Sequence, residues 1–163
     1  MDFSQLESST AAQKIGQYKL STEDMLFAKN AWRYIYPYAE VALTDFYEND
    51  FVQNLTGRLP NYSKLILVGK QIKYWNNIFS YGFNEIYIDD VIRIINSHRR
   101  LGISLPDYIT SYGIMLQKFE DILIKDRSDD LCHCENLSGL RKVFFLDICI
   151  VCSLYSDQHN QAA

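Results

Sequence analysis

The sequence predicts a single all-α domain, and three observations indicate it. Apolar residues recur at intervals of three and four over long stretches, as they do on one face of a helix. The seven glycines and three prolines fall mostly between those stretches, where they can begin or end helices. The sequence contains no strand-like alternation of any length, no internal repeat and no low-complexity tract. With 163 residues, the chain is long enough to bury one substantial core.

The helices follow from this periodicity and from the residues that interrupt it. Pro37 divides one long apolar stretch, because proline suits the first turn of a helix but not its interior. We expect a short helix around Phe3 to Ile15 and a polar loop from Lys125 to Glu135. The remaining predicted helices cover about residues 21–36, 37–54, 63–81, 88–101, 106–124 and 138–155.

Helix ends are marked by capping residues. Ser21 and Asp24 have the spacing of a capping box at the start of the second helix. Ser138 is the predicted N-cap of the last helix. Gly82 is expected to stop one helix, and Gly102 is in a suitable position for a C-cap of the next.

The charge and the apolar runs exclude several classes of partner. The net charge is −4, from 16 basic and 20 acidic residues, and no basic stripe is present for a phosphate backbone. No apolar run approaches the roughly 20 residues that cross a bilayer. The N-terminus lacks the pattern of a signal peptide, so the four cysteines are interpreted as thiols of a cytoplasmic protein. We expect neither nucleic-acid binding nor membrane insertion.

One histidine lies on an apolar helical face. Val91, Ile94 or Ile95, and His98 share that face in the helix that ends at Gly102. A buried imidazole needs partners for its nitrogens, so His98 is either a core residue bonded to backbone or tyrosine, or a metal or haem ligand. Periodicity alone leaves both interpretations open. No second histidine precedes it to supply an opposite axial ligand, so a haem held there would be open to an external ligand.

A haem would need a slot lined by large apolar side chains. The sequence offers candidates on several predicted helices: Phe46, Phe51, Leu55, Val68, Ile72, Trp75, Ile94 and Tyr112.

The cysteines offer a weaker alternative for metal binding. Cys132, His133 and Cys134 lie together in the polar loop, but structural zinc sites usually separate paired cysteines by two to four residues. Cys149 and Cys152 lie among apolar residues of the last helix and are interpreted as small core residues.

The segment from His98 to Tyr108, HRRLGISLPDY, resembles the proximal segment of globin-coupled sensors, a family related to the protoglobins. In that family a histidine precedes an arginine–aliphatic–glycine run, then a proline and aromatic residues. Phe46-Tyr47 resembles the family's Phe-Tyr pair on the second globin helix, and Trp75 resembles its distal-helix tryptophan. The resemblance covers roughly residues 20–157.

The resemblance implies a globin fold with an N-terminal extension helix and a reduced or absent D helix. It implies that His98 is the proximal iron ligand and that the hydroxyl of Tyr47 bonds bound dioxygen. Val68 matches a distal position that faces the ligand, and Lys64 lies near the pocket entrance. Leu101 and Tyr108 complete the expected haem pocket, although the spacing from Gly102 to Pro106 departs from the commonest one and leaves the role of Tyr108 open.

The function that the resemblance implies is gas sensing. Haem b would be held without covalent attachment, since the chain has no Cys-x-x-Cys-His motif, and would take O₂, CO or NO. The 163 residues would form one sensor domain that is not itself an enzyme. It would dimerise through its last two helices and signal to an output outside this chain, such as a diguanylate cyclase or a chemotaxis transducer. The alternatives are a haem-free, globin-like interaction module and a free-standing globin with O₂ or NO chemistry.

Overall fold

The computed structural model describes residues 3–59, 63–125 and 131–156, and every regular element in those ranges is a helix. This confirms the all-α prediction. The elements are α1 (Phe3–Tyr18), α2 (Thr22–Ile35), the 3₁₀ turn η1 (Tyr36–Tyr38), α3 (Ala39–Glu48), α4 (Asp50–Thr56), α5 (Lys64–Tyr81), α6 (Glu85–Arg100), α7 (Leu105–Lys125) and α8 (Leu131–Ser156).

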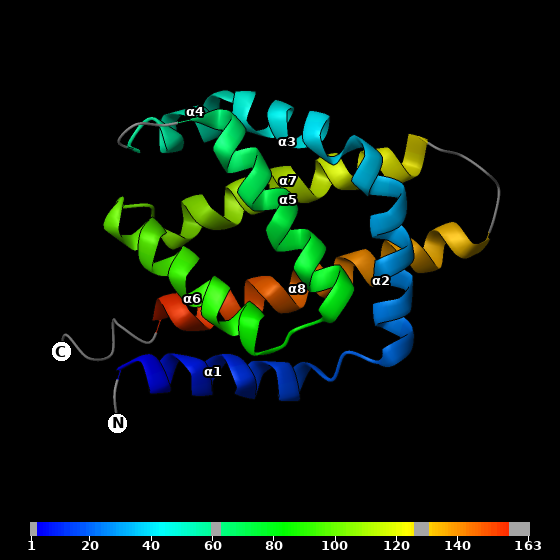
Figure 1. Cartoon of the computed structure of the whole chain (residues 1–163), viewed down its shortest axis with the longest axis horizontal. Coiled ribbons are helices and arrows are strands. Elements are labelled where there is room, and N and C mark those ends of the chain that lie inside the picture. Colours follow the sequence, from blue (N-terminus) through cyan, green and yellow to red (C-terminus); the bar gives the residue numbers. More distant parts are fainter. Residues whose placement is uncertain (1–2, 60–62, 126–130, 157–163) are drawn as a thin grey trace.

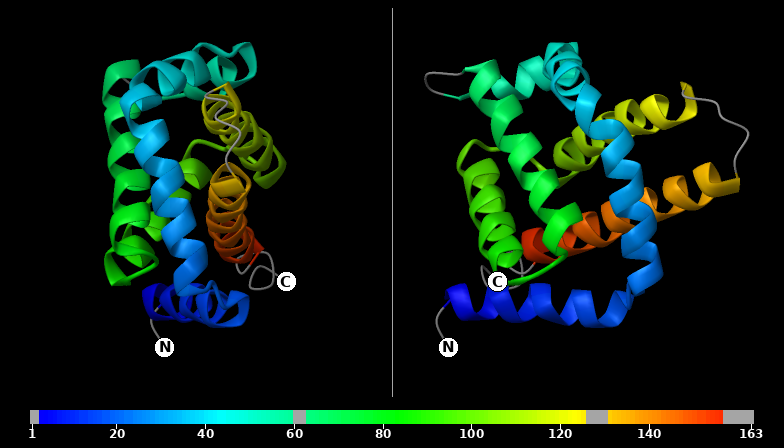
Figure 2. Two further views of the ribbon diagram at one scale, coloured as in Figure 1. Left: turned by 90° about the vertical axis from the view of Figure 1, so that its right-hand side faces the viewer. Right: turned by 45° about the vertical axis from the view of Figure 1, so that its right-hand side comes forward.

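The helices pack in crossing layers around one core. α5 crosses the front of the molecule, with α3 and α4 along one end and α1 along the other (Figure 1). α7 and α8 run in opposite directions on the side away from α5 (Figure 2). α3 bridges the layers, since it contacts both α5 and α7, while α1 contacts α6 and α8. Within the described ranges, no helix is both long and apolar enough to cross a bilayer.

Several of the predicted helix ends are confirmed. The Asp24 amide donates to the Ser21 hydroxyl at 3.0 Å, and the Ser21 amide donates to the Asp24 carboxylate at 3.1 Å, which completes the capping box of α2. Gly82 and Gly102 have φ angles of 71° and 66°, which glycine adopts without strain. Pro37 lies in the 3₁₀ turn between α2 and α3.

Other boundaries differ from the sequence prediction. The first helix has 16 residues and is not short. The helix expected from Pro37 to Asn54 is divided at Asn49, whose side chain accepts from the amides of Phe51 and Val52 and begins α4. An asparagine side chain can accept hydrogen bonds from nearby backbone amides, so Asn49 ends α3 and acts as the N-cap of a new helix, α4. Between α4 and α5, the described residues 57–59 and 63 form no helix.

The prediction that Ser138 caps the last helix is wrong. α8 begins at Leu131, so Ser138 lies inside it and is exposed. Serine costs only a few tenths of a kcal/mol within a helix, and the residues after Leu131 include no proline to stop one. The crossing of α8 with α2 explains why residue 139 is a glycine. A Cβ on Gly139 would lie 2.5 Å from the backbone nitrogen of Ala28, so only glycine fits where α8 crosses α2.

Candidate functional site

The last turn of α6 fixes the backbone of His98. The Ile103 amide donates to the His98 carbonyl at 3.0 Å, and the Gly102 amide donates to the Arg99 carbonyl at 2.9 Å. This pair of bonds is a Schellman motif, and it requires the left-handed conformation that Gly102 supplies. The glycine that follows the histidine in the sequence therefore ends the helix one turn beyond the imidazole.

The imidazole of His98 has one nitrogen engaged by its own helix. Nδ1 lies 2.8 Å from the Ile94 carbonyl, so the tautomer that donates from Nδ1 leaves the lone pair of Nε2 for another partner. Burial lowers the pKa of His98 below its ordinary value, with the bond to Ile94 opposing it, and this favours the neutral ring. A neutral histidine whose second nitrogen donates to a carbonyl is the usual arrangement of a metal ligand.

Tyr108, on α7, connects the histidine to the interior. Its ring meets the His98 ring edge-on with centroids 5.0 Å apart, and stacks on Tyr112 at 6.1 Å. Burial raises the pKa of Tyr108 well above 10, and the charges of Asp147, Tyr155 and Tyr47 raise it further.

The side chains expected on the distal side are buried where α3 packs against α5. Tyr47 is 6% exposed and Val68 is 2% exposed. The rings of Phe46 and Tyr47 meet edge-on at 4.9 Å. At the start of α5, the Lys64 ammonium pairs with the Glu48 carboxylate of α3, and both side chains are solvent-accessible. Lys64 thus ties the two helices together at the surface rather than pointing into the core.

Besides Lys64 and Tyr108, four of the expected pocket residues are only partly covered by the protein. A further expected residue, Leu55, is buried. Partly covered apolar side chains from four neighbouring segments are what an apolar ligand would bury. They are Phe51 of α4, Ile72 of α5, Ile94 of α6 and Leu101, which follows α6.

Two buried polar atoms on α5 have no hydrogen-bond partner among the described residues. They are the side-chain oxygen of Gln71 and the indole Nε1 of Trp75. Native structures leave few such atoms, and each is a place where a ligand or water can supply the missing partner. Together with the Nε2 lone pair of His98 and the partly covered apolar side chains, they fit a binding site for a flat, mainly apolar group with polar substituents.

Trp75 and Tyr112, both expected at the pocket, lie in the aromatic core. Trp75 is fully buried and stacks face-to-face on Phe144, with centroids 4.1 Å apart and planes 6° from parallel. Tyr112 meets the same Trp75 ring at 5.9 Å, while its hydroxyl turns towards α8. The two rings therefore support the packing of the helices that form the site.

A buried carboxylate links four helices behind the site, and the sequence interpretation missed it. Asp147 of α8 is fully buried and accepts hydrogen bonds from three tyrosines: Tyr74 of α5 at 2.5 Å, Tyr87 of α6 at 2.7 Å and Tyr112 of α7 at 2.8 Å. The Tyr112 hydroxyl also lies 3.1 Å from the Phe144 carbonyl. We refer to these four residues, Asp147 and its three tyrosines, as the Asp147 cluster.

Burial decides the electrostatics of the Asp147 cluster. Desolvation raises the pKa of Asp147 above its ordinary value, and the three hydroxyl donors partly oppose that shift. Burial, reinforced by the aspartate's charge, raises the pKa of each tyrosine well above 10. One sequence signal could have found the cluster, because Asp147 is the only charged residue in the apolar run from 143 to 152.

In the part of the chain whose side chains are described, the cysteines form no metal site of three or more ligands. Among the described residues, no three His, Cys, Asp or Glu side chains come together as ligands. The side chains of Cys132 and His133 lie outside the described part of the chain. The interpretation of Cys149 as a core residue is wrong: it is exposed, and Cys152 is half-buried. Their apolar neighbours in sequence face the core, but the helix turns these two positions away from it.

Comparison with known proteins agrees with this geometry. The family model described as Protoglobin matches residues 9–161, which is nearly the whole chain. No curated protein matches the sequence. The match extends through α8 and begins within α1, so it includes every helix that contributes to the site.

Proposed function

The chain belongs to the protoglobin family, whose members bind haem in a globin fold, and we propose on this basis that it is a haem-based gas sensor. In this proposal it binds haem b, with His98 as the proximal ligand, and responds to O₂, with CO and NO as competing ligands. The proposal rests on one observation above all. The His98 Nδ1 lies 2.8 Å from the Ile94 carbonyl, an arrangement that would leave the lone pair of Nε2 available to the iron.

Bound ferrous haem supplies an iron centre with an open position for a diatomic gas. The protein's own contribution is to orient and to exclude water. His98 would hold the iron through a ring that its own helix and Tyr108 both position. Tyr47 would donate a hydrogen bond to the gas ligand from a buried position, where such a bond is stronger than in water. Val68, also buried, would close the distal side without donating.

The residue after the proximal histidine supports a signalling role. Arg99 donates to the Glu7 carboxylate of α1 at 3.1 Å and to the Leu154 carbonyl near the end of α8. Its guanidinium also lies 5.3 Å from the centre of the Tyr155 ring. A movement of His98 on ligation would therefore reach both α1 and the carboxyl end of α8 through one adjacent side chain.

We also propose that the sensor acts as a homodimer through α7 and α8, with an output such as a diguanylate cyclase or a chemotaxis transducer beyond this chain. Exposed isoleucines support an interface on α7: Ile109 is 43% exposed and Ile124 is 48% exposed. Light scattering on the purified chain tests the dimer, and Ile124→Glu should convert it to a monomer.

Absorption spectroscopy tests the haem assignment. The purified chain reconstituted with haem should show a Soret band that shifts with CO, and His98→Ala should abolish or strongly alter that spectrum. His133→Ala, which removes another of the three histidines, is the matched control. A wild-type spectrum in His98→Ala would exclude His98 as the ligand, and the absence of any Soret band would favour the haem-free interaction module.

A free-standing globin is the remaining alternative, and a different measurement separates it from a sensor. Hydrogen exchange should change in α1 and at the end of α8 between the unliganded and CO-bound states if ligation is relayed through Arg99. A change confined to α5 and α6 would instead indicate ligand chemistry without a relay.

A further inference from the structure

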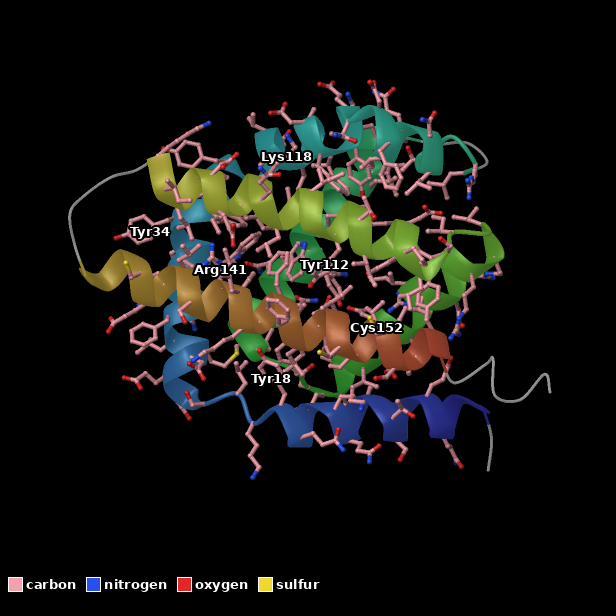
Figure 3. The ribbon with its side chains drawn as sticks, turned by 180° about the vertical axis from the view of Figure 1, so that it is seen from behind. Tyr18, Tyr34, Tyr112, Lys118, Arg141 and Cys152 are labelled. Atoms are coloured by element: carbon pink, nitrogen blue, oxygen red, sulfur yellow. The ribbon has the colours of Figure 1, made fainter. Side chains whose placement is uncertain are left out.

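A groove between α1 and α8 brings two thiols together on the surface. It has a volume of about 490 Å³, and its lining includes Lys14 and Tyr18 of α1 with Phe145, Cys149 and Cys152 of α8. Phe145 is 58% exposed, Cys149 is exposed and Cys152 is half-buried. Figure 3 views the molecule from this side, with Tyr18 and Cys152 labelled. His98 does not line this groove, and the proposed function does not use it.

The spacing of the two cysteines determines which bonds can link their sulfur atoms. They are three residues apart within the continuous helix α8, so both side chains line the same groove. Cβ atoms at this spacing lie about 5–6 Å apart, whereas a disulfide needs about 3.5–4.5 Å. A direct sulfur–sulfur bond would therefore distort the helix. A single atom bonded to both sulfurs bridges the longer separation without that distortion.

We propose that Cys149 and Cys152 form a binding site for a soft, thiophilic cation of low coordination number, of which Cu(I) is the representative. Both thiols lose their protons as two sulfur–copper bonds form: two RSH and Cu⁺ give [RS–Cu–SR]⁻ and two H⁺. No electrons are transferred.

The surroundings favour this occupant over zinc. Soft thiolates select Cu(I), which accepts two sulfur ligands, whereas structural zinc takes four nitrogen, sulfur or carboxylate ligands. No third His, Cys, Asp or Glu side chain joins the pair among the residues that the structure describes. The complex carries one negative charge, and the Lys14 ammonium at the rim of the groove can offset it. Phe145 and Tyr18 add apolar surface to the lining of the groove.

The test measures how many copper ions the haem-reconstituted chain binds. The background variant carries Cys132→Ser and Cys134→Ser, so that Cys149 and Cys152 alone remain of the chain's four cysteines. Under reducing, oxygen-free conditions it should retain about one Cu(I) per chain after desalting, by elemental analysis, which reads copper separately from haem iron. Competition with a coloured Cu(I) chelator then gives the affinity.

Single substitutions identify the ligands. Cys149→Ser and Cys152→Ser, each in the background variant, should weaken Cu(I) binding by at least about 100-fold, since outer-shell changes alone cost 10–100-fold. Lys14→Gln should weaken it less. Thermal unfolding by circular dichroism should change little in all three, because each substitution keeps a polar side chain of similar size and Cys149 is exposed.

Four results would overturn the proposal. The first is a background variant that retains no copper. The second is a single cysteine variant that binds as tightly as the pair. The third is ready conversion of the pair to a disulfide by oxidised glutathione, seen as a loss of two hydrogens in the intact mass, because that would contradict the spacing argument. Zinc binding with equal affinity would also exclude the assignment to a two-coordinate cation.

Discussion

Replacing Asp147 with alanine removes the acceptor for three buried hydroxyls at once. Tyr112 can still donate to the Phe144 carbonyl at 3.1 Å, but the hydroxyls of Tyr74 and Tyr87 keep only each other as partners. One of these two hydroxyls can donate to the other, so one buried donor is left without a partner, which costs about 1–3 kcal/mol. That is a large part of the roughly 5–15 kcal/mol that stabilises a domain of ordinary size.

Asp147→Asn is the matched control because it keeps one oxygen. The amide oxygen can accept from Tyr74 and Tyr87, and Tyr112 can turn to Phe144. Its unfolding free energy should stay within about 1 kcal/mol of the wild type. Urea unfolding at pH 7, followed by far-ultraviolet circular dichroism, measures both variants. The reasoning is refuted if alanine costs less than about 1 kcal/mol, or if asparagine costs as much as alanine.

The same cluster predicts a pH dependence of stability. Burial raises the pKa of Asp147 in the folded protein above the value of about 3.9 that an unfolded aspartate has. Between those two values the folded state binds more protons than the unfolded state, so stability falls as pH rises. The wild type should therefore lose stability relative to Asp147→Asn from about pH 4 upward until the folded carboxyl has ionised. A difference that is flat or rises over that range would contradict the shift.

Three further predictions concern the site and its supports. Tyr47→Phe should speed O₂ dissociation by about tenfold, which corresponds to the loss of one hydrogen bond of about 1.4 kcal/mol. Stopped-flow dissociation rates equal to those of the wild type would show that the Tyr47 hydroxyl does not contact the ligand. Gly139→Ala should destabilise the fold by about 1–3 kcal/mol, because the added methyl group overpacks against α2. The control Gly113→Ala, where no atom lies near the added methyl group, should be neutral or stabilising. Thermal melts in which Gly139→Ala is the more stable variant would contradict the close crossing of α8 and α2. Glu7→Ala should leave the Arg99 guanidinium without its nearly buried partner and increase hydrogen exchange in α1, and unchanged exchange there would mean that the pair does not hold α1.

The local signals in the sequence predicted the helices and most of their ends. The capping box at Ser21, the turn at Pro37 and the stops at Gly82 and Gly102 depend on a few neighbouring residues, so they could be recognised without knowing the fold. Ser138 misled because a capping residue is also tolerated inside a helix that packing stabilises.

Site residues divide in the same way. The apolar stripe and the Gly102 stop marked His98, and its bond to Ile94 is local to α6, only one turn away. The Asp147 cluster joins side chains 35 to 73 positions apart in the chain, and the exposure of Cys149 depends on how α8 meets α1. Such contacts leave no periodic trace, because a hydrogen bond between distant helices constrains no spacing along the sequence.

The sequence by itself thus determined that the chain is helical, where most of its helices begin and end, and which histidine stands on an apolar face in a segment of the protoglobin kind. Only the tertiary structure decided what surrounds that histidine: the Tyr108 ring against it, Arg99 reaching to α1 and α8, and a buried carboxylate behind it. The reason is physical. Helix formation and capping are governed by neighbours within a turn or two, whereas burial and long-range hydrogen bonds exist only once the helices have packed.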